Sequence, residues 1–218
     1  MVLPPGYDPG SSDFQSVAMT TSAKAGKSLF INICMNPYCS ELFFNFDPVI
    51  DTNVVFQQQA SLQKIDLKYI NPELVTLLDS VGLKIYYMEC FRREPRNFSD
   101  IHIDHYGEDE FVKINWIYGG NRSRMIWYQP KDNAVGELRN TSAKTPYMFY
   151  KLAEVDQVAE IITENKPYLI QAGKPHRIVN PLEVRYCVCC LLSNANGELT
   201  SMRAAQEKLA SYIVNGAG

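Results

Sequence analysis

The sequence predicts a mainly β protein with helices at its flanks, formed as a single domain over residues 1–218. From residue 84 onward, most of the chain consists of short runs rich in β-branched and aromatic residues, separated by turn signals such as Gly119-Gly120-Asn121. A chain of 218 residues is within the range that one β-sandwich or barrel fills. A composition of 46% hydrophobic and 21% charged residues excludes a disordered or coiled-coil protein.

The β-rich part follows an N-terminal extension, residues 1–60. Its first part, 1–27, contains several prolines and glycines and is expected to be a loop. Two short strands are expected in the extension, at 28–35 and 41–46. The strands of the β-rich part are expected at 84–91, 100–104, 111–118, 124–129, 167–171, 176–180 and 184–192.

Helices are expected where capping signals and helical spacing occur together. Asn71 is a good N-cap, Pro72 suits the first helical position, and Gly82 ends the helix that they begin. The segment 201–214 is amphipathic and predicts a C-terminal helix. The segment 153–165 has apolar residues at helical spacing, which leaves helix and strand open as alternatives.

Charge and hydropathy exclude two classes of partner. A net charge of -3 and a pI near 5.7 provide no basic excess for binding nucleic acid. The longest apolar run, residues 186–192, is far shorter than the ~20 residues needed to span a membrane. The first residues lack the basic start and apolar region of a signal peptide, so a cytoplasmic location is expected. The six cysteines are expected to be buried small hydrophobic residues rather than a disulfide framework.

Two of the three histidines have a spacing that suits a metal ion. His102 and Asp104 are two residues apart, so on a strand both side chains point to the same face. His176 begins another expected strand much later in the chain. Two histidines and one carboxylate on one side of a metal, with open positions opposite, are typical of non-haem Fe(II) oxygenases. We therefore expect these three residues to bind one metal ion.

Arg185 is expected to bind an anionic group of a ligand. The segments 176–179 and 184–192 are expected to form a hairpin around a four-residue loop. In that register Arg185 lies on the same face as His176, roughly 7 Å away by strand rise. A guanidinium among apolar neighbours such as Cys187 is desolvated and requires an anion. A dicarboxylate that chelates the metal at one end could reach Arg185 with the other.

An H-x-D sequence followed by a distal histidine, and about ten residues later by an arginine, resembles the pattern of the Fe(II)/2-oxoglutarate-dependent dioxygenase superfamily. The segments IHIDHYGEDEFVKINWIYGGNRSRMIWYQP and PHRIVNPLEVRYCVCCLLS look like bacterial and viral members whose substrates are unassigned. The resemblance extends over residues 70–192. It implies a double-stranded β-helix, the jelly-roll or cupin-like fold, with its core at about residues 84–192.

The resemblance also implies roles for individual residues. His102, Asp104 and His176 match the ligands of Fe(II), and Arg185 matches the residue that binds the distal carboxylate of 2-oxoglutarate. Asn115, on the strand expected at 111–118, is a further candidate contact for this cofactor. The implied reaction uses molecular oxygen and 2-oxoglutarate, hydroxylates a small-molecule or peptide substrate, and releases succinate and CO2.

Two other hypotheses remain open. A cupin-like metalloenzyme would use the same three ligands without 2-oxoglutarate, and would leave Arg185 without a function. A non-catalytic jelly-roll would bind a ligand or another protein, and its histidines and aspartate would then be incidental.

Overall fold

The computed structural model describes residues 36–57, 60–104, 110–141, 144–180 and 182–214. These residues all belong to one unit of the chain. The loop expected at 1–27 and the strand expected at 28–35 lie outside the described residues.

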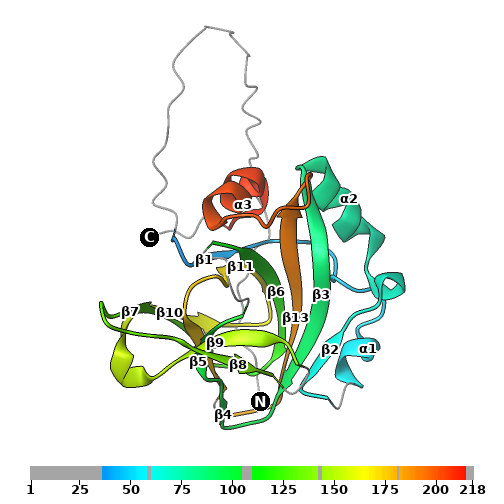
Figure 1. Cartoon of the computed structure of the whole chain (residues 1–218). Coiled ribbons are helices and arrows are strands. Elements are labelled where there is room, and N and C mark those ends of the chain that lie inside the picture. Colours follow the sequence, from blue (N-terminus) through cyan, green and yellow to red (C-terminus); the bar gives the residue numbers. More distant parts are fainter. Residues whose placement is uncertain (1–35, 58–59, 105–109, 142–143, 181, 215–218) are drawn as a thin grey trace, which may run out of the picture. The chain divides into compact units, whose positions relative to one another are not determined.

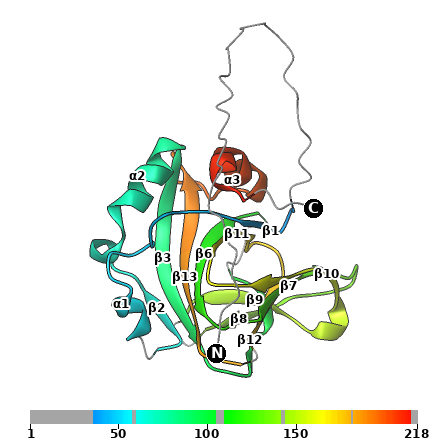
Figure 2. The same ribbon diagram turned by 180° about the vertical axis from the view of Figure 1, so that it is seen from behind.

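The described residues form two antiparallel sheets, which confirms the prediction of a mainly β protein. The long strands β3, β13 and β6 lie side by side in Figures 1 and 2. The first sheet runs in the order β1 (Cys39–Glu41), β11 (Pro167–Gln171), β6 (Val112–Gly119), β13 (Arg185–Asn194), β3 (Leu83–Arg93) and β2 (Leu62–Lys64). The second runs in the order β10 (Val155–Thr163), β7 (Ser123–Pro130), β12 (His176–Asn180), β5 (Ile101–Ile103), β9 (Pro146–Tyr150) and β8 (Glu137–Asn140), with β4 (Asn97–Phe98) beside β12.

Eight of these strands form two arms whose strands pair with each other in order. The first arm is β3, β5, β6 and β7, and the second is β10, β11, β12 and β13. The pairs are nested: β3 pairs with β13, β5 with β12, β6 with β11, and β7 with β10, all antiparallel. Because successive strands of each arm alternate between the two sheets, the arms wind around the space between the sheets.

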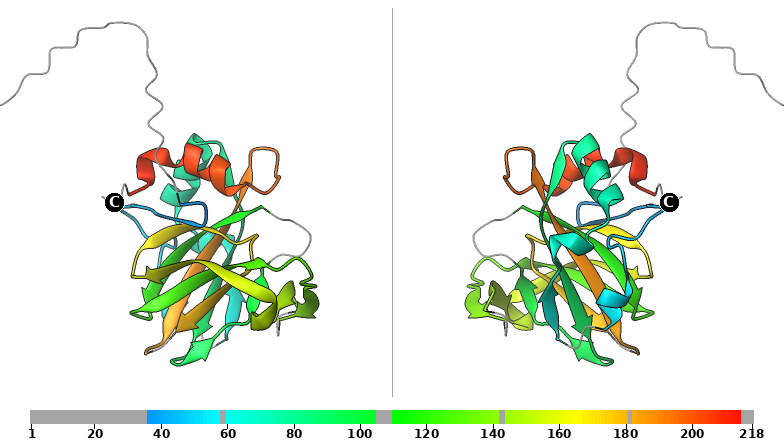
Figure 3. Two further views of the ribbon diagram at one scale, coloured as in Figure 1. Left: turned by 90° about the vertical axis from the view of Figure 1, so that its left-hand side faces the viewer. Right: turned by 90° about the vertical axis from the view of Figure 1, so that its right-hand side faces the viewer.

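The first sheet is buried on both faces. Its inner face packs against the second sheet through residues such as Ile117 of β6 and Trp127 of β7. Its outer face packs against α2 (Pro72–Ser80) and α3 (Met202–Lys208), which lie next to each other in Figure 3. Burial of both faces explains the nearly continuous apolar sequence of β13. Successive residues of this strand alternate between the helices on one side and the second sheet on the other, so both sets are buried.

The helix α2 begins where its capping signals predict. The Asn71 Oδ1 accepts a hydrogen bond from the Glu73 backbone N–H at 2.9 Å, and Pro72 occupies the first helical position. Gly82 follows the helix with a φ of 68°, a left-handed conformation that favours glycine. The C-terminal helix is shorter than expected, because α3 ends at Lys208 and a 3-10 turn follows at Ala210–Tyr212. The other short helical segments are α1 (Asn53–Phe56) and 3-10 turns at Leu67–Tyr69 and Leu152–Glu154.

The structure settles one open alternative and corrects one expectation on local structure. The segment 153–165, left open between helix and strand, is mostly strand β10, because it pairs with β7 from Val155 to Thr163, with a register shift after Gln157. The strand expected at 41–46 is displaced, since β1 ends at Glu41 and the chain then leaves the sheet. None of the helices in the described part of the chain is long and apolar enough to cross a membrane.

The packing of α2 on the sheet predicts a large loss of stability when its buried face is truncated. Leu74 is 0% exposed within the core between the helices and the first sheet. Leu74→Ala should therefore reduce the free energy of unfolding by about 2–5 kcal/mol, measured by denaturant titration. The matched control is Val75→Ala, because Val75 is the next residue of α2 and is 41% exposed. Equal losses in the two variants would contradict this packing.

Candidate metal centre

His102 and His176 lie directly opposite each other on the paired strands β5 and β12. Their ring centroids are 4.8 Å apart. Asp104 follows β5, and its Oδ1 lies 2.8 Å from the His102 Nε2 while its Oδ2 lies 3.7 Å from the His176 Nε2. The structure thus brings together the three residues that the sequence predicts as metal ligands, with their ligand atoms all within 4.8 Å of one another.

Backbone carbonyls fix how both imidazole rings are oriented. The His102 Nδ1 lies 2.8 Å from the Asp100 carbonyl, and the His176 Nδ1 lies 2.9 Å from the Lys174 carbonyl. A carbonyl only accepts hydrogen bonds, so each Nδ1 carries the proton, and in a neutral ring each Nε2 carries the lone pair. Both Nε2 atoms face the Asp104 carboxylate. Three groups that converge in this way could all bind one metal ion, so the donor set fits a metal ion.

Burial favours the neutral form of His176. It lowers the pKa of His176 to about 4, and this effect outweighs the attraction of the Asp104 carboxylate. The ring is therefore neutral near pH 7, which is the form that binds metal ions.

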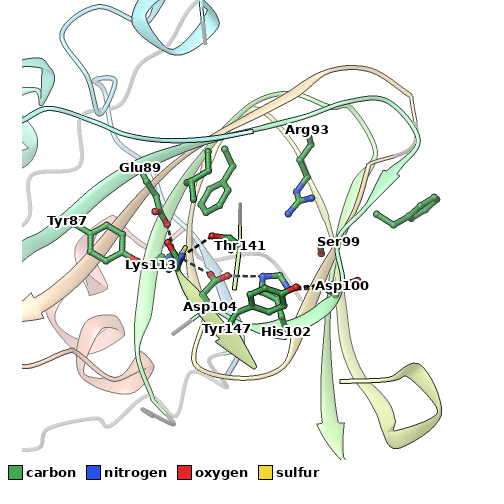
Figure 4. Close-up of a pocket in the computed structure, with 14 residues that line it drawn as sticks. Tyr87, Glu89, Arg93, Ser99, Asp100, His102, Asp104, Lys113, Thr141 and Tyr147 are labelled. Atoms are coloured by element: carbon green, nitrogen blue, oxygen red, sulfur yellow. Dashed lines mark hydrogen bonds and ion pairs between the residues drawn. The ribbon is translucent and has the colours of Figure 1, made fainter. Parts of the chain in front are cut away.

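Lys113 is a charged residue of the site that the sequence reasoning missed. It lies on β6 and is 1% exposed. Its Nζ lies 3.0 Å from the Glu89 Oε1 and 3.2 Å from the Asp104 Oδ2 (Figure 4). A lysine inside an apolar strand was the signal that could have revealed it, because a buried ammonium requires a carboxylate partner.

The charges of Lys113 and Asp104 stabilise each other. Burial alone would raise the pKa of Asp104, but attraction to Lys113 and to the two histidines holds it well below its usual range. Burial alone would lower the pKa of Lys113, but the charges of Asp104 and Glu89 hold it well above its usual range. Both groups are therefore charged over the whole neutral pH range.

Arg185 faces the same space as the histidines, although not through the expected hairpin. The expected pairing of 176–179 with 184–192 is wrong, because β12 belongs to the second sheet and β13 to the first. The two strands instead face each other across the interior. Arg185 is 2% exposed, and its Nε is buried without a hydrogen-bond partner among the described residues.

These residues line one cavity between the sheets, which we call the inter-sheet cavity. Its wall contains the three candidate ligands and Arg185, together with Phe91, Arg93, Asn115, Met125, Ile170, Ile178, Cys187 and Cys189. Asn115 is buried, and its Oδ1 has no hydrogen-bond partner among the described residues. Two polar groups that line the same cavity without a partner, the Arg185 Nε and the Asn115 Oδ1, indicate a site for a polar ligand.

Cys187 and Cys189 occupy the part of this wall that follows Arg185 on β13. Their sulfur atoms are 3.4 Å apart, and Cys190 faces the helices on the other side of the strand, because side chains alternate along a strand. Burial alone would raise the pKa of Cys187, but a hydrogen bond with Cys189 and the charge of Arg185 lower it.

A second cavity of about 290 Å³, which we call the side cavity, adjoins the candidate ligands (Figure 4). It shares Phe91, Arg93, His102 and Asp104 with the inter-sheet cavity. Its other lining residues include Tyr87, Glu89, Phe98, Ser99, Asp100, Lys113, Thr141, Thr145 and Tyr147. The Tyr147 ring lies edge-on to the His102 ring, with centroids 5.7 Å apart. A molecule in this cavity would lie beside His102 and Asp104.

No protein-family model matches the chain, and no curated protein matches its sequence. One solved structure with partial similarity is an oxidoreductase of the 2OG-Fe(II) oxygenase family from Burkholderia pseudomallei, with 11% identity and a TM-score of 0.31 over 54% of this chain and 48% of that one. The match therefore spans about half of the oxygenase. Another is Peruvianin-I, a cysteine peptidase from Thevetia peruviana latex, with 15% identity and a TM-score of 0.32 over 77% and 96% of the two chains. Both TM-scores are too low to establish a shared fold.

The buried ion pairs of Lys113 predict a large and pH-dependent loss of stability when this residue is removed. Lys113→Ala leaves the buried Glu89 and the partly buried Asp104 without their shared cation, and in metal-free protein at pH 7 it should reduce the free energy of unfolding by about 3–5 kcal/mol. The pKa of Asp104 is lowered in the folded state, so the contribution of its ion pair is present above the unfolded pKa of ~3.9 and is lost as the pH falls further. The difference between the variant and the unaltered protein should therefore shrink below about pH 4.

Denaturant titrations of chelator-treated protein at neutral and acidic pH measure this difference. The matched control is Lys166→Ala, which removes ion pairs of 3.0 Å with Glu41 and 3.2 Å with Glu164 from a lysine whose side chain is 43% exposed. That loss should be below about 1 kcal/mol. A Lys113→Ala effect as small as that of the control would show that the buried ion pairs do not form in solution.

Proposed function

We propose that this chain is an Fe(II)- and 2-oxoglutarate-dependent oxygenase that hydroxylates a small-molecule or peptide substrate and releases succinate and CO2. The observation that carries the proposal is the inter-sheet cavity. It combines two histidines and an aspartate that could hold a metal ion with a buried guanidinium whose Nε has no partner among the described residues. A metal-chelating dicarboxylate would satisfy both parts of this cavity at once.

The nested pairing of the two arms supports the double-stranded β-helix as the fold of this enzyme. In a jelly-roll, a long antiparallel pair of arms winds so that its strands divide between two sheets. The pairs β3–β13, β5–β12, β6–β11 and β7–β10 follow this arrangement, and β5–β12 contributes both histidines.

His102, Asp104 and His176 would hold the iron. With 2-oxoglutarate and oxygen, the iron supplies the oxidising chemistry that hydroxylates an unactivated carbon. The chain's own contribution is to orient these groups. The carbonyls of Asp100 and Lys174 orient the imidazoles, and Lys113 holds Asp104 in its charged form.

Arg185 and Asn115 would bind 2-oxoglutarate. A planar guanidinium in a buried site can hold a carboxylate through two parallel hydrogen bonds. Asn115 lies opposite Cys189, on the strand next to that of Arg185, and its amide could donate to a second oxygen of the cofactor. The Cys187 thiol, a weak hydrogen-bonding group, lines the same cavity as Arg185.

The proposal extends to a cytoplasmic location. The thiols of Cys187 and Cys189 are free, although their sulfur atoms are only 3.4 Å apart. A reducing compartment preserves two neighbouring thiols in this state.

The three candidate ligands should determine metal binding. His176→Ala and Asp104→Ala should each abolish stoichiometric binding of Fe(II), or of Mn(II) as a surrogate, because a site with two remaining ligands loses most of its affinity. Metal content after gel filtration measures this, with circular dichroism as the test of folding. Asp156→Ala is the matched control, since the Asp156 side chain is 70% exposed. Unchanged metal content in either ligand variant would falsify the assignment.

Arg185 should determine the affinity for 2-oxoglutarate. Removing one partner of a buried, charge-assisted pair costs about 2–5 kcal/mol, so Arg185→Ala should weaken 2-oxoglutarate binding by roughly 30-fold to several thousand-fold. Arg185→Lys should recover only part of the loss, because a point charge does not reproduce the planar fork. Anaerobic titration of the iron-loaded protein, followed by the visible charge-transfer band, measures these affinities.

Iron binding should change little in both Arg185 variants, because this residue is not a candidate ligand. Loss of iron together with 2-oxoglutarate would mean that Arg185 supports the fold. Full activity without Arg185 would favour the cupin-like metalloenzyme that does not use 2-oxoglutarate.

A further inference from the structure

Arg93 is a second guanidinium in the site, and the 2-oxoglutarate proposal gives it no role. It lies directly opposite Arg185 on the paired strands β3 and β13. Both arginines line the inter-sheet cavity, but only Arg93 also lines the side cavity. Figure 4 shows its guanidinium pointing into the side cavity, on the side where His102 and Asp104 lie. Arg93 therefore stands where the two cavities meet.

The described residues leave the charge of Arg93 without a counterion in contact. Its Nη1 donates to the neutral Asn97 Oδ1 at 3.2 Å. No carboxylate of a described residue lies within 4.0 Å of Arg93 or Arg185. Like charges directly opposite each other on paired strands are destabilising, so two such arginines indicate that anions bind there. Consistent with this, burial and the neighbouring charge of Arg185 lower the pKa of Arg93.

Other charged residues that line the two cavities have partners of opposite charge. The Lys113 ammonium is paired with the Glu89 and Asp104 carboxylates. The Asp100 carboxylate lies 3.7 Å from Arg139, which also pairs with Glu137 at 2.8 Å. If Arg185 is neutralised by the distal carboxylate of 2-oxoglutarate, as proposed above, Arg93 is the cation that still lacks a partner in contact.

The residues that line the side cavity indicate the character of the rest of a ligand whose anionic group binds Arg93. Tyr87, Phe91, Phe98 and Tyr147 provide aromatic surface around a volume of about 290 Å³. Such a volume is at the small end of the range for pockets that bind small molecules. An apolar or aromatic body of modest size would therefore fit beside Arg93.

We propose that the side cavity binds a small organic carboxylate as the substrate, with Arg93 holding its carboxylate and the aromatic residues holding its apolar body. This inference rests on the proposed function, since the cavity becomes a substrate site only if the adjacent residues hold the iron and 2-oxoglutarate. Arg93 would then determine which class of molecule is hydroxylated, whereas Arg185 would determine the use of 2-oxoglutarate.

A matched pair of probes tests this proposal without knowledge of the natural substrate. The probes are 3-phenylpropanoate and its uncharged amide, 3-phenylpropanamide, titrated into full-length protein loaded with Mn(II) and 2-oxoglutarate. Ligand-detected NMR gives each affinity, and paramagnetic relaxation of the probe protons by Mn(II) shows whether the probe lies beside the metal. The acid should bind about ten-fold or more tightly than the amide, because only the acid forms a charge-assisted pair with Arg93.

Arg93→Gln should remove this preference for the acid and leave the affinities for Mn(II) and 2-oxoglutarate unchanged. Arg93→Lys should retain part of the preference, because it keeps the charge. Arg92→Gln is the matched control: Arg92 is the preceding residue of β3, lies opposite Tyr186 and forms an ion pair with Glu94. This control should behave as the unaltered protein.

Three outcomes would overturn the inference. Equal affinity for acid and amide, or binding of neither, would show that the side cavity does not select anions. An unchanged preference in Arg93→Gln would move the anion site to another residue. Loss of 2-oxoglutarate affinity in Arg93→Gln would assign Arg93 to the cofactor. Failure of the proposed function is a separate result, because the unaltered protein would then bind neither Mn(II) nor 2-oxoglutarate in the titrations that precede the probes.

Discussion

The candidate metal centre depends on one backbone register, that of β5 against β12. This register places His102 directly opposite His176, although the two residues are far apart in the chain. Because side chains alternate between the faces of a sheet, a shift of one residue would turn one histidine away from the interior. The pairs β3–β13, β6–β11 and β7–β10 belong to the same nested arrangement and oppose such a shift. The site is thus a consequence of how the whole chain pairs, not of a local motif.

The two faces of the first sheet have different roles: one packs against the helices, and the other lines the inter-sheet cavity. On β13, Val188 and Cys190 contribute to the apolar core beneath the helices, whereas Arg185 and Cys187 line the inter-sheet cavity. On β6, the buried Lys113 occupies the cavity side in the same way. Lys113 can be buried on that side because it is paired with Glu89 and Asp104, and the helix-covered side supplies the hydrophobic stabilisation. A strand that reads as uniformly apolar can therefore still carry a functional face.

The sequence predicts those features that local signals determine. The capping residues Asn71 and Pro72 mark the start of α2 correctly, because a cap acts within one helical turn. Features that depend on residues far apart in the chain are harder to predict from the sequence. The segment 153–165 has helical spacing, yet it is mostly strand because β7 is available to pair with it. Arg185 lines the same cavity as His176 from the opposite sheet and not through a hairpin, since the sequence does not reveal which sheet a strand joins. The partner of Lys113 was likewise hidden, because Glu89 is on another strand.

The strands β8 and β9 lie in the connection between β7 and β10, outside the four nested pairs. The same connection nevertheless contributes Thr141, Thr145 and Tyr147 to the lining of the side cavity. β9 pairs with β5 at His102 and supports that strand, whereas β8 pairs with β9 at the edge of the sheet. A change in β8, or in the residues between β8 and β9, would therefore leave the pairing of the arms intact. The architecture is therefore modular: this edge of the second sheet can be altered to change what enters the cavity, while the strands that place the histidines are kept. The same property makes this connection the natural place to begin directed evolution towards new ligands.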